Sequence, residues 1–172
     1  GVMLVSTTTS VDGKTYKFDS NGVATETTPI YQESGNYVKV YDAKNGKYYY
    51  MEKQFLQHPG IADGTVSDLD LLAAVCDAEA GDQGLIGMEA VALCILNSTI
   101  DTSKGFPSEI RYVVYQGKPT QYAVVTDGSL LKRLNGHFSD RTNAYAAAKA
   151  AMKIFNNYVT KGTKRVLTGF KT

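Results

Sequence analysis

One glutamate, Glu79, has a setting in this sequence that suits acid–base chemistry. Leu72, Val75 and Cys76 precede it at helical spacing, so Glu79 extends the apolar stripe of a helix predicted over residues 67–80. Burial on that stripe and the negative end of the helix dipole both raise the pKa of a carboxyl group. A carboxyl group kept protonated near neutral pH is what general-acid cleavage of a glycosidic bond needs. The spacing alone leaves open that Glu79 turns to solvent at the helix end.

Five further acids have less apolar surroundings than Glu79, and we interpret them as solvated or capping residues. These acids are Asp77, Asp82, Glu89, Asp127 and Asp140. None of them stands out as a second catalytic carboxylate. That matters because hydrolases of glycosides generally use two carboxyl groups.

A second helix is expected over residues 85–98, with small residues along one face. This face is made by Gly87, Ala90, Cys94 and Asn97. We expect it to let another helix approach closely, with Asn97 pointing into the contact. There Asn97 would be a buried hydrogen-bonding residue or a brace for the loop after Glu79.

The two cysteines and two histidines do not predict a metal centre. Cys76 and Cys94 lie in apolar helical patterns, so we expect two reduced thiols in the core. His58 precedes a Pro-Gly turn and His137 follows a glycine, so both are expected in loops. Two loop histidines are too few for a protein-built zinc site, and we expect no metal and no cofactor.

Composition limits the classes of partner. The formal net charge of +1 gives no electrostatic support for binding nucleic acid. No apolar run approaches the roughly 20 residues that span a bilayer. No signal peptide is recognisable in a chain that opens with Gly1 and reads as a fragment. We therefore expect a globular protein without a membrane span or a nucleic-acid partner.

The chain divides by pattern into three predicted parts. Residues 1–51 are rich in Thr, Tyr, Gly and Lys and alternate in polarity, which predicts small β-hairpins, one of them turning at Asn45-Gly46. Residues 52–66 show no sustained period and are interpreted as a linker. Residues 67–172 are predicted to form a compact, mainly α-helical domain, so the fold class is α+β, mainly α.

Further elements of the 67–172 domain follow from local signals. Ser67 and Asp70 form a near capping-box pattern at the start of the first helix. The other predicted elements are helices over 107–115, 129–134 and 139–158, an extended piece over 121–125 and a strand over 165–170.

Several motifs resemble one known family. Glu79-Ala80-Gly81-Asp82-Gln83, then Gly87, Ala90-Val91-Ala92 and Ile95-Leu96-Asn97, are similar to the signature of the spore-cortex-lytic and cell-wall hydrolase family. The likeness continues through Phe106-Pro107, Val113-Val114-Tyr115-Gln116, Gln121-Tyr122 and Asp127-Gly128. It covers about residues 68–160. Ser98 and Gln83 depart from the family pattern, which usually has Arg and often has Glu at these places.

The resemblance implies a fold, an activity and a site. The fold would be lysozyme-like, related to goose-type lysozymes and soluble lytic transglycosylases. The activity would be cleavage of the bond between N-acetylmuramic acid (MurNAc) and N-acetylglucosamine (GlcNAc), with Glu79 as the sole catalytic acid/base. Gln121 and Tyr122 would line the substrate groove, and we add Asn97 to the predicted substrate-binding residues.

The N-terminal segment has a likeness of its own. Residues 11–23 resemble one repeat of the cell-wall-binding, choline-binding-type modules, with Lys17 in place of a common aromatic residue. A single repeat lacks the neighbour that completes a ligand site. It suggests a longer parent protein.

Four functions are considered on these grounds, of which the fourth, a zinc amidase that cuts the peptide stem, lacks ligands because two loop histidines are too few. The first is a lytic transglycosylase that leaves 1,6-anhydro-MurNAc ends and needs only one carboxyl group. The second is a lysozyme-type muramidase, which needs a second carboxylate or a residue such as Gln121 to position water. The third is a non-catalytic peptidoglycan-binding module, against which the apolar setting of Glu79 argues. We expect a monomeric protein, secreted or associated with the cell wall, whose partner is the peptidoglycan glycan strand.

Overall fold

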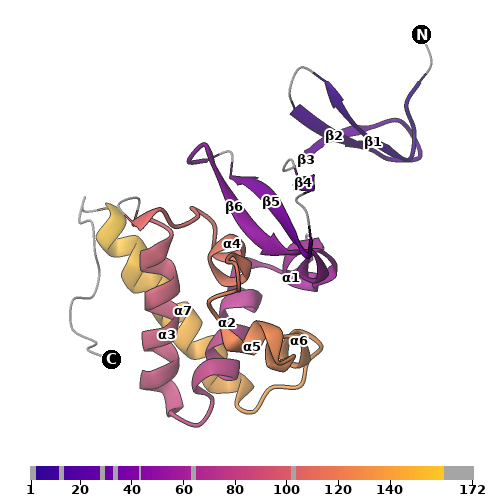
Figure 1. The fold of residues 1–172 in the computed structure, drawn as a ribbon. Coiled ribbons are helices and arrows are strands. Elements are labelled where there is room, and N and C mark those ends of the chain that lie inside the picture. The colour runs from indigo at the N-terminus through magenta and orange to yellow at the C-terminus, as the bar shows by residue number, and fades with distance from the viewer. Residues whose placement is uncertain are drawn as a thin grey trace.

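The computed structural model describes residues 3–11, 14–27, 30–32, 35–42, 44–62, 65–101 and 104–160. Two small antiparallel sheets come first in the chain (Figure 1). The first sheet contains β1 (Thr7–Val11), β2 (Lys14–Phe18) and β3 (Ala24–Thr27). The second contains β4 (Ile30–Gln32), β5 (Tyr37–Asp42) and β6 (Lys47–Glu52). The predicted hairpins are confirmed, and Gly46 takes the positive φ of +71° that its turn requires.

Helices make up the rest of the described chain. A 3-10 helix, η1, spans Lys53–Gln57, and the α-helices are α1 (Pro59–Ala62), α2 (Asp68–Ala80), α3 (Gly84–Ser98), α4 (Ile110–Tyr115), α5 (Ala123–Thr126), α6 (Ser129–Leu134) and α7 (Arg141–Thr160). The mainly helical α+β class is confirmed. Within the described residues, no helix is long and apolar enough to cross a membrane.

Two sequence-based boundaries are corrected. Helix α4 begins at Ile110 rather than Pro107. The reason is that Ser108 is held by β5, since its backbone N–H donates to Asp42 Oδ2 at 2.7 Å. The piece predicted as extended over 121–125 contains the short helix α5 from Ala123. The strand predicted over 165–170 lies outside the described residues.

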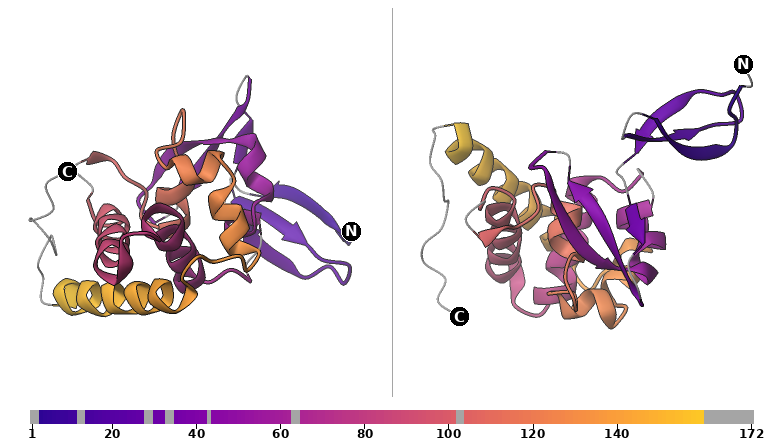
Figure 2. Two further views of the ribbon diagram at one scale, coloured as in Figure 1. Left: turned by 90° about the horizontal axis from the view of Figure 1, so that it is seen from below. Right: turned by 45° about the horizontal axis from the view of Figure 1, so that its top comes forward.

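Helix α2 is the centre of the core. Its side chains Leu72, Ala73 and Val75 are 0% exposed, because α2 packs against both α3 and α7. Figure 2 shows α7 running across α2 and α3 along one side of the helical body. The predicted start of α2 is confirmed as a capping box. Ser67 Oγ accepts from the backbone N–H of Asp70 at 3.1 Å, and the Asp70 carboxylate accepts from the N–H of Ser67.

The second sheet and the segment after it share this core. Val38, Val40, Met51 and Phe55 belong to the same buried cluster as the residues of α2. The segment 52–66, predicted as a linker, carries η1 and α1 and contributes Phe55 at 1% exposure. The first sheet instead projects away from the helices (Figures 1 and 2). The packing therefore favours a domain boundary near residue 30 over the predicted one at 51.

The tip of the β5–β6 hairpin is tied to the loop before α4. Asp42 is only 1% exposed and its carboxylate accepts from both the backbone N–H and the hydroxyl of Ser108 at 2.7–2.8 Å. Tyr49 Oη donates to the carbonyl of Phe106 at 2.9 Å. A buried carboxylate needs such donors, so this contact fixes the hairpin on the helical body.

Candidate active site

Glu79 lies in the last turn of α2 and its side chain is half-buried. Three features of its surroundings affect the pKa of its carboxyl group. Burial raises the pKa of Glu79, the nearby Asp127 carboxylate raises it further, and a hydrogen bond from the backbone of Val124 partly offsets the shift. The direction agrees with the apolar setting predicted from the helix spacing. The side chain does not simply turn to solvent at the helix end.

The phenol of Tyr122 lies close enough to the Glu79 carboxylate for that charge to raise the pKa of Tyr122. Tyr122 is the N-cap residue of α5, and its phenol is largely removed from solvent. Burial raises the pKa of Tyr122 far above its usual range, and Cys94, Glu79 and Cys76 add to the shift. Tyr122 therefore sits where α2, α3 and α5 meet. Two of the predicted site residues, Glu79 and Tyr122, are brought together.

Gln121 and Asn97 are linked to Glu79 and Tyr122 less directly, through residues beside them in the chain. Gln121 is exposed and directly precedes Tyr122. Asn97 is half-buried in the last turn of α3, three residues after Cys94 and so on the same helix face. We therefore place both residues near the site only because Tyr122 and Cys94, their neighbours in the chain, lie there.

The small-residue face of α3 was expected to be buried against another helix. Instead it is the more exposed side of α3. Cys94 is exposed, and Gly87, Ala90 and Asn97 are partly exposed, whereas the buried side is formed by other residues of α3. The buried residues are Met88, Ala92, Leu93, Ile95 and Leu96. Larger aliphatic side chains cover more apolar area and therefore take the core side. The expectation of two core cysteines is correct for Cys76, at 0% exposure, and wrong for Cys94.

Gly87 has a local reason to be glycine. A Cβ at this position would lie 2.5 Å from Cβ of Gln83, the residue that precedes α3. The side chain of Gln83 thus folds back over the first turn of α3, beside the turn that follows Glu79. The place where the family often has a second acid is occupied here by a neutral amide that covers Gly87.

Asp127 is the second acid near Glu79. It is exposed and ends α5, and its carboxylate accepts from the backbone N–H of Ser129 at 2.7 Å. This hydrogen bond, that of the Ser129 hydroxyl and the nearby Lys132 and Arg133 lower the pKa of Asp127. Asp127 is therefore ionised while Glu79 is pushed towards its protonated form. Gly128 follows with φ +82° and lets the chain turn into α6.

Asp77 is not solvated. It is 1% exposed, and Arg133 Nε donates to it at 2.8 Å. The backbone N–H groups of Ser139 and Asp140 also donate to it, at 2.8 and 2.7 Å. Burial alone would raise the pKa of Asp77, but these donors together hold it below its usual value. Asp77 thus caps the start of α7 from α2, which confirms the capping interpretation and corrects the solvated one.

The histidines form no metal site in the part of the chain that the structure describes, where no group of His, Cys, Asp and Glu could hold a metal ion. His58 lies in the bend between η1 and α1, as predicted, but its side chain is partly buried. Its ring lies 5.1 Å from that of Phe55 and 5.6 Å from that of Tyr115, centroid to centroid. Burial lowers the pKa of His58. The imidazole packs as part of an aromatic cluster, and its burial favours the neutral form.

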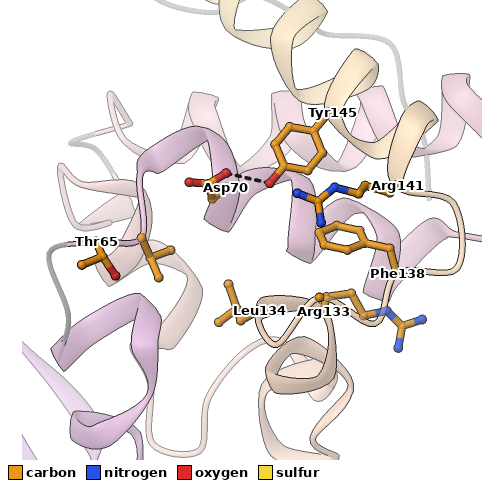
Figure 3. A pocket seen from close by; sticks show the side chains of 9 residues that line it. Thr65, Asp70, Arg133, Leu134, Phe138, Arg141 and Tyr145 are labelled. Atoms are coloured by element: carbon orange, nitrogen blue, oxygen red, sulfur yellow. Dashed lines mark hydrogen bonds between the residues drawn. The ribbon is translucent and has the colours of Figure 1, made fainter.

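A pocket of about 280 Å³ opens elsewhere, between the starts of α2 and α7 (Figure 3). Tyr145 Oη donates to Asp70 across it at 2.6 Å, and the Arg141 guanidinium lies 5.2 and 5.1 Å from the ring centroids of Phe138 and Tyr145. Glu79 is not among the residues that line this pocket. Its polar groups already bind one another.

Comparison with known proteins adds one match. A family model described as Cell Wall Hydrolase matches residues 82–168, which is half of the 172-residue chain. No curated protein and no solved structure matches the chain. The match starts just after Glu79 and does not reach residues 11–23, so the role of Glu79 and the likeness to a cell-wall-binding repeat stay predictions. The chain belongs to the cell wall hydrolase family.

Proposed function

We propose that this protein cleaves the MurNAc–GlcNAc glycosidic bond of peptidoglycan, with Glu79 as the catalytic acid and base. Membership of the cell wall hydrolase family supports an enzyme that acts on peptidoglycan. The observation that carries the choice of Glu79 as the acid is its half-buried carboxyl group, whose pKa is raised by burial, whereas the choice of the MurNAc–GlcNAc bond follows from the family resemblance. A protonated carboxyl group supplies the proton that a leaving sugar oxygen needs.

The favoured reaction is lytic transglycosylation. Glu79 donates its proton to the glycosidic oxygen as the bond to C1 of MurNAc breaks. The resulting carboxylate then takes the proton of the C6 hydroxyl of the same sugar, whose oxygen bonds to C1 and closes a 1,6-anhydro ring. An intramolecular hydroxyl has a high effective concentration, so one carboxyl group suffices. We assign Tyr122, Gln121 and Asn97 to the groove that holds the glycan.

Muramidase activity is the second candidate, and Asp127 favours it. The sequence offered no second acid in a suitable setting, but in the structure Asp127 lies within electrostatic range of Glu79. Its pKa is lowered by the hydrogen bonds from Ser129, while that of Glu79 is raised by burial. Two carboxyl groups pushed apart in this way can act as acid and as base or nucleophile. Water would then add to C1.

Mass spectrometry of digested peptidoglycan separates the two reactions. Transglycosylation gives products ending in 1,6-anhydro-MurNAc, lighter by one water than hydrolysis products. Reducing MurNAc ends that accept borohydride would replace the transglycosylase with the muramidase. In that case Asp127→Asn should abolish activity, whereas for a transglycosylase it should lower activity much less than Glu79→Gln. Intact glycan with the wild-type protein would reject both.

Fold, location and binding are proposed on the same grounds. We propose a lysozyme-like catalytic domain, supported by the position of the half-buried Glu79 at the end of the central helix α2. Because peptidoglycan lies outside the cell membrane, the protein would act outside the cell or in its wall. The first sheet would serve as the cell-wall-binding repeat that residues 11–23 resemble. A monomeric state remains a prediction.

A further inference from the structure

The outward face of the β5–β6 hairpin carries a group of aromatic and basic side chains. We call it the tyrosine platform. It consists of Tyr37, Lys39, Tyr41, Tyr48 and Tyr50 of the hairpin and Lys118 of the loop after α4. All five hairpin residues are at least partly exposed, and Tyr48 is 52% exposed.

The alternation of the two strands produces this platform. In β5 the even-numbered residues, such as Val38 and Val40, are buried in the core, and the odd-numbered ones face outward. The register places Lys39 opposite Tyr50 and Tyr41 opposite Tyr48. The Tyr41 and Tyr48 rings are accordingly 5.0 Å apart between centroids. The core thus fixes one face of the hairpin and leaves the aromatic face to solvent.

Lys118 completes the platform from a neighbouring loop. Its ammonium lies 5.0 Å from the ring centroid of Tyr37 and 4.9 Å from that of Tyr50, and the Lys39 ammonium lies 5.6 Å from Tyr50. The loop is fixed beside β6 because the backbone N–H of Gly117 donates to the carbonyl of Tyr50 at 2.7 Å. These cation–π contacts hold the rings and both charges in one place before any ligand binds.

The chemistry of the platform suits a glycan that carries carboxylates. Aromatic faces are electron-rich and apolar, so they stack on the C–H face of a pyranose ring. Two lysines beside those rings can pair with acidic groups spaced along the same polymer. Peptidoglycan combines both features, since its sugar rings carry lactyl groups and peptide stems with carboxylates.

The platform and the proposed catalytic groove are formed by different residues, although Lys118 of the platform and Gln121 of the groove belong to the same loop. Figure 1 shows the β5–β6 hairpin on one side of the helical body and the turn after α2, which follows Glu79, on the other. None of the platform residues is among those whose charge or hydrogen bonds act on Glu79, so variants of the platform leave the surroundings of the catalytic carboxyl group in place. We propose that the tyrosine platform is an anchoring site for the peptidoglycan glycan strand, which holds the enzyme on insoluble wall. The identity of the ligand rests on the proposed function.

Pelleting with purified sacculi tests this site without interference from cleavage. The protein carries Glu79→Gln, and bound and free fractions are measured over a range of sacculus concentrations. We expect Tyr41→Ala/Tyr48→Ala to weaken binding about tenfold, and Tyr41→Phe/Tyr48→Phe, which keeps the rings, to bind like its parent. Tyr158→Ala is the matched control, because Tyr158 is exposed at the far end of α7. It should not change binding.

Lys118→Glu provides an independent variant should the double alanine variant fail to fold, as judged by circular dichroism. It should also weaken binding about tenfold. Equal pelleting of the folded Ala/Ala and parent proteins, or no pelleting of the parent, would overturn the proposal. Binding that disappears once anionic secondary polymers are stripped from the sacculi would assign the platform to those polymers instead. Cleavage by the wild-type protein is measured separately on soluble glycan fragments, so failure of the proposed function is distinguishable.

Discussion

Glu79 combines a position set by helix periodicity with an environment that only neighbouring elements supply. Burial and Asp127 both favour its protonated form. Replacement by Gln should lower glycan cleavage by about 10²–10⁴-fold, the usual effect of losing general-acid assistance. Glu89→Gln, on the partly exposed side of α3, is the matched control. Clearing of a peptidoglycan gel by Glu79→Gln at the wild-type rate would end the assignment.

The same carboxyl group should contribute to the pH dependence of the free energy of unfolding. Because its folded pKa lies above the usual value of 4.5, the folded protein binds this proton more tightly than the unfolded chain does. The contribution of Glu79 to stability is thus fully present below pH 4.5 and is lost as the pH rises through the folded pKa. Glu79→Gln should therefore raise the free energy of unfolding relative to the wild type more at pH 7 than at pH 4. Urea titrations at the two pH values test this, and an equal effect at both would contradict it.

The two cysteines should differ in reactivity. Cys94 is exposed near Tyr122, whereas Cys76 is 0% exposed and burial raises the pKa of its thiol to about 12. A maleimide should therefore label one thiol in the native protein and two after unfolding. Labelled protein should also lose glycan cleavage, because the adduct would enter the proposed groove. Cys94→Ser, treated in the same way, should keep its activity.

At the scale of the elements, the junction of α2 with α7 depends on one buried carboxylate. Asp77 accepts hydrogen bonds from Arg133 and from the backbone N–H groups of Ser139 and Asp140, the two residues that immediately precede α7. We predict that Asp77→Asn lowers the free energy of unfolding by about 3–5 kcal/mol, the usual cost of breaking a buried ion pair. The exposed Asp82→Asn is the control. Equal urea midpoints for the two variants would show that the capping contacts contribute little.

The whole molecule joins the second sheet to the helices, and truncation should show where the domain begins. A chain starting near residue 30 keeps every core residue of the hairpin and should unfold cooperatively. A chain starting at Ser67 loses Val38, Val40, Met51 and Phe55 from the core. Each such side chain contributes about 1.5–3 kcal/mol, so their sum rivals the about 5–15 kcal/mol that holds a domain folded. Thermal unfolding of both chains tests this. A stable fold for the shorter one would restore the boundary first predicted.

Local sequence determined much of this molecule. Hairpin turns, the capping box at Ser67 and the apolar stripe that ends in Glu79 each depend on residues within a few positions of one another, so periodicity and turn chemistry predict them. The motifs around Gly87 and Asp127 likewise pointed to the cell wall hydrolase family that the comparison shows.

Only the tertiary structure decided which faces are buried and which acids meet. Asp127 comes near Glu79, and Ser139 near Asp77, through contacts between residues far apart in the chain. The exposure of Cys94 depends on how α3 packs, because its larger aliphatic face takes the core and leaves the small one outside. The hairpin predicted as part of a separate module became part of the core through Val38 and Met51. Such contacts follow from the burial of area between elements, which no local pattern encodes.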